Sequence, residues 1–403
     1  FEINKLKVLK WYILFFAFIL NKQFVFLQKK IRIMNFEFTE EQKLIQEAAR
    51  NFAEREALLD VIERDEKAEY PTKHVQRMKE LGFLGMDSLS YVIALEEISK
   101  HDSSLAVIMS VHNSLACWGL ENLANEDQKQ RFLKPLARAE KIGAFLLSEP
   151  EAGSDATHQK SIAEDMGDYY LLNGVKNWIT SANTADIYLV IAQTNPELKH
   201  KGINAFIVDR HSEGITLGPH ENKMGMRSSD THSVMFNNVK VPKENRIGEN
   251  GFGFKFAMKC LEVGRIGIAA QALGIAEGAY MRALKYAKER KAFGTEIANH
   301  QAIAFKLADM AVKIETAKLL LYKAATMKDN HEPIALIGAM AKRYCADIAM
   351  EVTTEAVQIH GGYGYVKEYH VERLFREAKL TQIYEGTSEI QKIVISRAIL
   401  SEN

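Results

Sequence analysis

The sequence changes character at Tyr169-Tyr170-Leu171-Leu172-Asn173-Gly174-Val175, where β-favouring residues flank an Asn-Gly pair. Asn-Gly is the strongest short-range signal for a two-residue turn between antiparallel strands, so this stretch predicts a β-hairpin. Period-2 patterns predict further strands at Ile187 to Gln193, Ala205 to Asp209 and His232 to Val241. We therefore expect a small, mainly antiparallel β domain over residues 142–245.

Helical patterns surround this block on both sides. From Thr39 to about Arg138 glycines are few and apolar residues recur three and four apart, which is typical of helices. Beyond Gly251 long helical patterns cover Met258 to Lys288, Gln301 to Met327, Pro333 to His360 and the residues after Ser388. The expected fold is α+β and multidomain: an N-terminal helical domain over 34–141, the middle β domain, and a C-terminal four-helix bundle over 246–403.

Residues 1–33 differ from the rest. Trp11 to Leu20 is an apolar run flanked by lysines, but no small-residue cleavage site follows it, as a secretory signal would require. The run is roughly half of the ~20 apolar residues that span a membrane, and a single arginine, Arg32, argues against a mitochondrial transit peptide. Because Met34 begins a stretch with its own N-cap residue, Thr39, we interpret residues 1–33 as translated upstream sequence and expect no stable membrane insertion.

Bulk composition excludes several classes of protein. The 403 residues are 47% hydrophobic, which is enough for a large core, and 52 basic residues balance 52 acidic ones. Because the net charge is zero, the chain has no overall positive field that would attract nucleic acid. Cys117, Cys260 and Cys345 are widely separated, which argues against a disulfide framework and a zinc site and favours a reducing compartment. We expect a soluble protein without a metal.

The segment with the most chemical content is Ile383-Tyr384-Glu385-Gly386-Thr387-Ser388-Glu389-Ile390-Gln391. Ser388 and Gln391 match a capping box, so a helix is expected to begin there with Glu385 on the loop ahead of it. Helix N-termini present unpaired N–H groups, so Thr387 and Ser388 could meet a diphosphate while Glu385 faces a substrate. The alternative is a solvated loop glutamate beside an ordinary cap.

Two further segments carry a resemblance. Phe145-Leu146-Leu147-Ser148-Glu149-Pro150-Glu151-Ala152-Gly153-Ser154-Asp155 and Trp178-Ile179-Thr180 resemble the two flavin segments of the acyl-CoA dehydrogenase family, and the α, β, α order resembles this family along nearly all of residues 34–403. The resemblance implies FAD as cofactor, with Ser148 and Thr180 at the polar edge of the ring and Trp178 covering it. The cofactor contacts implied here are Phe145, Leu147, Ser148, Gly153, Ser154, Trp178, Ile179 and Thr180, and Ser154 would also lie beside the acyl-CoA.

Other segments resemble family elements that reach the cofactor diphosphate and adenosine across a subunit boundary. They lie at Glu289 to Gly294, at His300-Gln301 and at Gln358 to Gly364. The resemblance implies cofactor contacts at Arg290, Phe293, Gln301, Gln358, Gly361, Gly362, Thr387, Ser388 and Glu389, and a homotetramer built as a dimer of dimers. Neither a GxGxxG after a strand nor a GxxxxGK[ST] loop is present, so a Rossmann site is not expected. Arg290 as a surface residue, Trp178 as a core aromatic and Gly361-Gly362 as a helix stop are the alternatives.

The family resemblance also assigns the catalytic base. Most members carry it at the place of Glu385, and a few carry it on a C-terminal helix immediately before an arginine, which here is Gly264 ahead of Arg265. Glu262 cannot replace it, because two residues along a helix turn a side chain by about 200°. The implied substrate contacts are Ser154, Gly264, Arg265 and Gly386. The run from Leu261 to Ala269 looks most like the short-chain, butyryl-CoA-type members.

The implied function is FAD-dependent α,β-dehydrogenation of a short-chain acyl-CoA to the trans-2-enoyl-CoA in fatty acid β-oxidation, with electrons passed to an electron-transferring flavoprotein. Glu385 would take the α-proton, its backbone N–H and a ribityl hydroxyl would stabilise the enolate, and desolvation beside Tyr384 should raise its pKa. The alternatives are an acyl-CoA oxidase or flavin monooxygenase, or a non-catalytic acyl-CoA-binding or assembly protein. The implied location is the cytoplasm of a bacterium or the mitochondrial matrix of a eukaryote.

One departure from the family concerns the N-terminal domain. After Leu81-Gly82-Phe83-Leu84-Gly85-Met86 the family leads us to expect a glycine-rich loop with a Tyr-Gly-Gly element, but the chain passes directly into Asp87-Ser88-Leu89. This loop joins two helices that help to enclose the substrate side. Its shortening is expected either to strain the connection or to open the pocket, and it bears on acyl-chain specificity.

Overall fold

The computed structural model describes residues 37–86 and 88–401. Our interpretation of residues 1–33 falls outside these residues. The chain divides into two units between Lys43 and Leu44, and all tertiary contacts discussed below lie within the second. In the first unit, Thr39 caps a helix as predicted, because the backbone N–H of Gln42 donates to Thr39 Oγ1 (3.2 Å) and the N–H of Thr39 donates to Gln42 Oε1 (2.9 Å).

The first helical block agrees with the predicted pattern. Its α-helices are α2 (Glu40–Arg55), α3 (Val61–Lys67), α4 (Thr72–Glu80), α5 (Ser88–Ser99), α6 (Ser103–Ser110), α7 (Trp118–Leu123), α8 (Glu126–Gln128) and α9 (Lys134–Ala137), with π-helical turns at Val111–Cys117 and Lys129–Leu133. Asp102 caps α6 by accepting from the backbone N–H of Leu105 (3.0 Å). Between α4 and α5, the backbone N–H of Gly85 donates to Asn113 Oδ1 (2.7 Å), so the short connection is tied to the helical core.

The middle block is an eight-stranded sheet. Its strands are β1 (Gly143–Leu146), β2 (Ile162–Asp165), β3 (Tyr169–Thr180), β4 (Ile187–Gln193), β5 (Ile203–Asp209), β6 (Ile215–Leu217), β7 (Thr231–Pro242) and β8 (Arg246–Ile247). They are ordered β6-β7-β3-β2-β4-β5-β8, and β1 pairs in parallel with β4. β4 is fully buried because β1 and β5 flank it, which explains its unbroken run of apolar residues.

The predicted Asn-Gly hairpin is wrong. Asn173 and Gly174 lie inside the single strand β3, and the chain reverses earlier, between β2 and β3. The pairing of β3 with β7 shifts register between Leu172 and Gly174, and Gly174 has φ +140° with no room for a side chain, since a Cβ would lie 2.4 Å from Ser161 Oγ. The glycine marks a β-bulge rather than a turn, because long-range pairing overrides the local turn preference.

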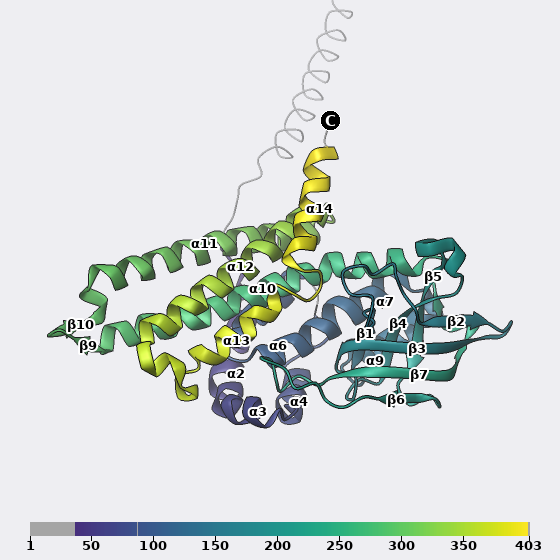
Figure 1. The fold of residues 1–403 in the computed structure, drawn as a ribbon, viewed down its shortest axis with the longest axis horizontal. Coiled ribbons are helices and arrows are strands. Elements are labelled where there is room, and N and C mark those ends of the chain that lie inside the picture. Colours follow the sequence, from purple (N-terminus) through teal and green to yellow (C-terminus); the bar gives the residue numbers. More distant parts are fainter. Residues whose placement is uncertain (1–36, 87, 402–403) are drawn as a thin grey trace, which may run out of the picture. The chain divides into compact units, whose positions relative to one another are not determined.

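The C-terminal block contains the long helices α10 (Gly253–Glu289), α11 (Gln301–Asp329) and α12 (Ala335–His360), followed by α13 (Val371–Thr381) and α14 (Ser388–Ser401). A two-stranded ribbon, β9 (Lys291–Ala292) with β10 (Thr295–Glu296), links α10 to α11. α10 extends from the sheet through the bundle and packs on α5, α11, α12 and α13 (Figure 1). Residues 263–279 of α10 are therefore buried on all sides. The helical, β, helical order is confirmed, although α13 was not predicted.

No helix in the part of the chain that the structure describes combines the length and the apolar character needed to cross a membrane.

Candidate active site

Glu385 lies on the loop between α13 and α14, as predicted. Its backbone has φ +52°, and the next residue, Gly386, has φ +91°. A glutamate in the left-handed region is strained, so the surrounding structure must hold this turn in place. Both carboxylate oxygens are buried, and neither has a hydrogen-bond partner among the described residues. A buried carboxylate without partners is costly for a fold, which singles this group out for chemistry.

The turn is held by side chains of α12 and α14. Lys342 Nζ donates to the carbonyl oxygen of Gly386 (2.7 Å), and Gln391 Nε2 donates to the same oxygen (2.8 Å) and to that of Glu385 (3.3 Å). The predicted capping box of Ser388 and Gln391 is wrong. The cap is Thr387, whose Oγ1 accepts from the N–H of Ile390 (3.3 Å), while Ser388 Oγ donates to Asp347 Oδ1 (3.2 Å).

Electrostatics make Glu385 a stronger base than an exposed glutamate. Burial raises the pKa of the Glu385 carboxyl to about 7, although the positive charges of Lys342 and Arg265 pull that pKa down. Burial likewise lowers the pKa of Lys342 to about 8, against the opposing effect of Glu385. The expected rise in the pKa of Glu385 is thus present, and at neutral pH its protonation is evenly balanced.

Gly264 of α10 faces the carboxylate directly. A Cβ on Gly264 would lie 1.9 Å from Glu385 Oε2 and 3.0 Å from Leu115 Cδ2. The two positions that the family resemblance offered for the base therefore converge on one point in space. Since two groups cannot occupy it, the glycine makes room for Glu385. Arg265, the next residue, is buried, and its Nε has no hydrogen-bond partner among the described residues.

Apolar and neutral polar groups form the walls around the carboxylate. Tyr384 donates its hydroxyl to Gln271 Oε1, and Tyr91 donates its hydroxyl to Ser110 Oγ (2.9 Å). Burial raises the pKa of Tyr91, and the negative charge of Glu385 adds to this. A cavity of about 260 Å³ extends from Tyr91 and Val263 to Gly85 and Met86, at the connection where the expected loop is missing.

The flavin-like segments come together within the sheet, where the residues after β1 run beside the last part of β3. The N–H of Asn177 donates to the carbonyl oxygen of Ser148 (2.8 Å), so the segment after β1 is joined to the end of β3. Trp178 sits at a second register shift of β3 with φ +61°, and 61% of its surface is exposed. It is not a core aromatic. An exposed indole held in the left-handed region offers a flat apolar surface to a ligand.

A buried ion pair fastens these segments together. Lys176 Nζ donates to Glu149 Oε1 (2.6 Å), to Gln159 Oε1 (2.8 Å) and to the carbonyl oxygen of Leu147 (3.1 Å). Burial lowers the pKa of Lys176 to about 8, and Glu149 opposes this. The remaining predicted residues lie close in sequence to this junction: Phe145 and Leu147 are buried, Ile179 is buried, Thr180 is half-buried, and Gly153 and Ser154 lie exposed on the loop after Glu149.

The residues predicted to reach a diphosphate lie at a second place. Arg290, Gly361 and Gly362 line a cleft of about 480 Å³ together with Tyr286, Ile297, Ile359, His360, Tyr363 and Val366. The Arg290 guanidinium lies 5.5 Å from the centre of the Tyr363 ring. Phe293 is 98% exposed, and Gln301, Gln358 and Glu389 are also exposed. This cleft shares no lining residue with the cavity between Tyr91 and Gly85.

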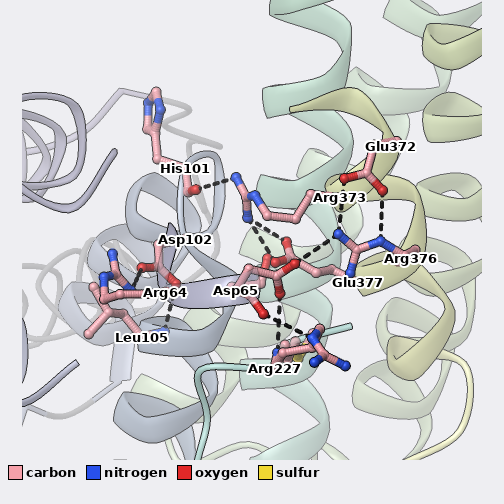
Figure 2. Close-up of polar contacts among 12 residues, drawn as sticks. Arg64, Asp65, His101, Asp102, Leu105, Arg227, Glu372, Arg373, Arg376 and Glu377 are labelled. Carbon is pink, nitrogen blue, oxygen red and sulfur yellow. Dashed lines mark hydrogen bonds and ion pairs between the residues drawn. The ribbon is translucent and has the colours of Figure 1, made fainter. Parts of the chain in front are cut away.

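Helix α13, which leads into the Glu385 loop, is anchored to other parts of the fold by one ion pair and two hydrogen bonds to backbone carbonyls (Figure 2). Arg376 Nη2 donates to Asp65 Oδ2 of α3 (2.8 Å), and Arg376 Nη1 donates to the carbonyl oxygen of Met224 (2.8 Å), on the segment before β7. Arg373 is paired with Glu377 (2.8 Å) and donates to the carbonyl oxygen of His101 (2.7 Å). The loop therefore starts from a fixed helix.

Sequence reasoning missed Lys342, Gln391 as a support of the turn, and the Lys176–Glu149 pair. The available signal was weak: each lysine interrupts an otherwise apolar or β-favouring run, as a surface lysine also does. Among the described residues no group of His, Cys, Asp or Glu is arranged to hold a metal ion.

Comparisons with known proteins agree with this fold and its order of domains. Family models described as the N-terminal, middle and C-terminal domains of acyl-CoA dehydrogenase match residues 39–140, 144–239 and 251–400. The chain is 46% identical to the short-chain specific acyl-CoA dehydrogenase of Clostridium acetobutylicum and 46% identical to the caffeyl-CoA reductase-Etf complex subunit CarC of Acetobacterium woodii, each match covering 91% of this chain and 100% of the relative. The butyryl-CoA dehydrogenase structure from Megasphaera elsdenii superposes with a TM-score of 0.90 at 45% identity, covering 91% of this chain and 100% of that one.

Proposed function

The chain belongs to the acyl-CoA dehydrogenase family, and from this premise we propose that it oxidises a short-chain acyl-CoA thioester to the trans-2-enoyl-CoA with Glu385 as the base. The observation that carries this proposal is the buried Glu385 carboxylate, which has no hydrogen-bond partner among the described residues and a pKa raised to about 7. Such a group can take a weakly acidic proton at neutral pH.

A single side chain, that of Glu385, performs the proton transfer. The thioester carbonyl makes the adjacent C–H acidic, and the carboxylate of Glu385 removes that proton in a site from which water is excluded. The positive charges of Lys342 and Arg265 act on the Glu385 carboxylate and favour its ionised form. Tyr384 and Tyr91 stay protonated because burial raises the pKa of both hydroxyls, so neither competes as a base.

The residues present fit FAD. Trp178, exposed and strained beside Ser148, offers a stacking surface, and Arg290 with the glycines Gly361 and Gly362 offers a cationic, open cleft for a diphosphate. When bound, FAD supplies the acceptor for the hydride that leaves the β-carbon. Because the two sets of residues lie apart in one chain, we propose that the Arg290 cleft serves the cofactor of a second copy, in a homotetramer built as a dimer of dimers.

The cavity of about 260 Å³ is lined by Tyr91, on which the charge of Glu385 acts, and by Val263, the neighbour of Gly264. Its size supports a short acyl chain. Two relatives named above are a short-chain specific dehydrogenase and a butyryl-CoA dehydrogenase, and a third is a subunit of an Etf complex. We therefore propose butyryl-CoA or a similar thioester as the substrate and an electron-transferring flavoprotein as the acceptor. The corresponding location is the cytoplasm of a bacterium or the mitochondrial matrix of a eukaryote.

The test is Glu385→Gln in the FAD-loaded enzyme. Anaerobic bleaching of the flavin by butyryl-CoA should slow by about 10²- to 10⁴-fold, the usual contribution of a general base, while FAD content stays normal. Glu213→Gln, at an exposed position away from the site, is the matched control and should bleach at the wild-type rate. A near-normal rate in Glu385→Gln would refute the assignment of the base. Repeating the assay with longer acyl-CoAs tests the chain-length proposal.

A further inference from the structure

Among the residues that the structure describes, two lysines are fully buried, and they differ in their partners. Lys176 and Lys342 each have 0% of their surface exposed. Lys176 forms an ion pair with Glu149 at 2.6 Å. Lys342 has no carboxylate within 4.0 Å among the described residues, and the hydrogen bond of its ammonium goes to the neutral carbonyl of Gly386. A buried ammonium without a contacting counter-ion is expensive, so Lys342 calls for a reason beyond stability.

The charged groups around the Glu385 turn suggest that reason. The titratable groups that act on this cluster are Tyr91 from α5, Cys260, Glu262 and Arg265 from α10, Lys342 and Asp347 from α12, Tyr384 from the loop, and Glu389 from α14. Among the described residues, Lys342 and Arg265 are the two cations that act on the Glu385 carboxylate. Of these two, Lys342 is the one with a hydrogen bond to the turn that carries Glu385.

Resting on the proposed role of Glu385 as the base, we propose that Lys342 is its positioning residue: the ammonium holds the Glu385–Gly386 turn through the Gly386 carbonyl and supplies positive charge that keeps the carboxylate ionised. Both effects act through Glu385, and Lys342 itself touches no reacting atom. The direction of the electrostatic effect agrees, because Lys342 is the larger of the two influences that lower the pKa of Glu385.

Gln391 provides the matched control for the two parts of this role. Its Nε2 donates to the same Gly386 oxygen at 2.8 Å, compared with 2.7 Å for Lys342 Nζ, but it carries no charge. Removing Gln391 weakens the hold on the turn and leaves the charge in place. Removing the ammonium of Lys342 loses both. The two substitutions therefore separate a mechanical contribution from an electrostatic one.

The experiment measures kcat of the FAD-loaded enzyme with butyryl-CoA from pH 6 to pH 9 for Lys342→Met, Lys342→Arg and Gln391→Met. Loss of the positive charge raises the pKa of Glu385, so the rise of kcat with pH should move to higher pH in Lys342→Met. For a shift of about one unit, kcat falls about 5- to 10-fold at pH 6–7. Near pH 9 the difference becomes small, because the Glu385 carboxylate is then ionised in both enzymes.

The other two variants separate the effect of the Lys342 charge from the effect of its hydrogen bond. Lys342→Arg should keep the wild-type pH profile, and Gln391→Met should lower kcat by a similar factor at every pH. A reduced rate with an unmoved profile in Lys342→Met would overturn the proposal and leave Lys342 a structural residue. If Lys342→Met yields no FAD-loaded enzyme, a shifted profile in Lys342→Arg refutes the charge-based role. Failure of the proposed function is distinguishable, because it appears as full activity in Glu385→Gln irrespective of Lys342.

Discussion

The two ends of one segment, from Val371 to Gly386, treat buried charge in opposite ways. On α13, Arg373 and Glu377 are each only 1% exposed and are paired with each other at 2.8 Å, and Arg376 is paired with Glu372 and Asp65 (Figure 2). A few residues later both oxygens of Glu385 are buried without a hydrogen-bond partner in the described part of the chain. Pairing satisfies a charge and fixes a helix, whereas leaving a carboxylate unpaired keeps it available to a substrate.

The largest expected effect comes from removing Arg373, which breaks the Arg373–Glu377 ion pair on α13. Arg373→Met leaves Glu377 buried without its cation, which typically costs about 3–5 kcal/mol. The thermal midpoint of the FAD-loaded enzyme should fall strongly at fixed protein and FAD concentrations. Activity per bound flavin, measured at a temperature where the variant is folded, should remain close to that of wild type. A variant of normal stability would contradict the view that this pair fixes α13.

A second change tests the unpaired end of the segment by filling the space next to the Glu385 carboxylate. In Gly264→Ala the new Cβ would lie 1.9 Å from Glu385 Oε2, so the carboxylate must move. A displaced base should lower kcat with butyryl-CoA by about 100-fold. Gly338→Ala is the matched control in the same bundle, since its Cβ would have only ordinary contacts, 3.6 Å from the carbonyl oxygen of Glu262. Equal rates in the two variants would show that the carboxylate has room to move.

The third prediction concerns the free energy of unfolding that is lost when the unpaired Glu385 ionises in the folded protein. Burial raises its pKa from the ordinary value of 4.5 to about 7, so the folded protein binds this proton more tightly than the unfolded chain does. The resulting stability is full below pH 4.5 and is lost as the pH rises through 7. Between pH 5.5 and pH 8 this loss amounts to about 2 kcal/mol, and Glu385→Gln should lack it.

The measurement for this third prediction is the thermal midpoint of the substrate-free, FAD-loaded enzyme across that pH range. Glu213→Gln should keep the wild-type slope, since this exposed side chain lies away from the site. The same pH dependence in Glu385→Gln and wild type would mean that the carboxylate is not ionised at a cost in the folded protein.

The smallest expected effect concerns the helix start. Thr387→Ala removes the Oγ1 that accepts from the N–H of Ile390 and should cost about 1 kcal/mol of stability, as N-cap losses do. Thr387→Ser keeps the hydroxyl and should be close to wild type in the same thermal assay. If Thr387→Ala leaves the thermal midpoint unchanged, α14 does not depend on this cap, and Gln391 with Lys342 is sufficient to hold the turn.

The parts of the fold that the sequence predicted well depend on local pattern. β4 was predicted with its observed bounds, and α11 and α12 were predicted to within a few residues, because long apolar periodicities survive in any tertiary setting. The Asn173-Gly174 turn failed because pairing of β3 with β7 supplied more hydrogen bonds than a local turn could. The Ser388 cap failed because Asp347, on another helix, takes up that hydroxyl.

By itself the sequence determined the order of helical and β blocks, the presence of a glutamate just ahead of a helix, and the resemblance on which the function was inferred. Only the tertiary structure decided that the carboxylate of Glu385 is buried, that Gly264 leaves space for it, and that Lys342 supports its turn. The physical reason is the range of the interactions. Helix and strand patterns depend on residues that are close in sequence, whereas the desolvation and the electrostatic field at the Glu385 carboxylate come from α10, α12 and α14, which pack around it.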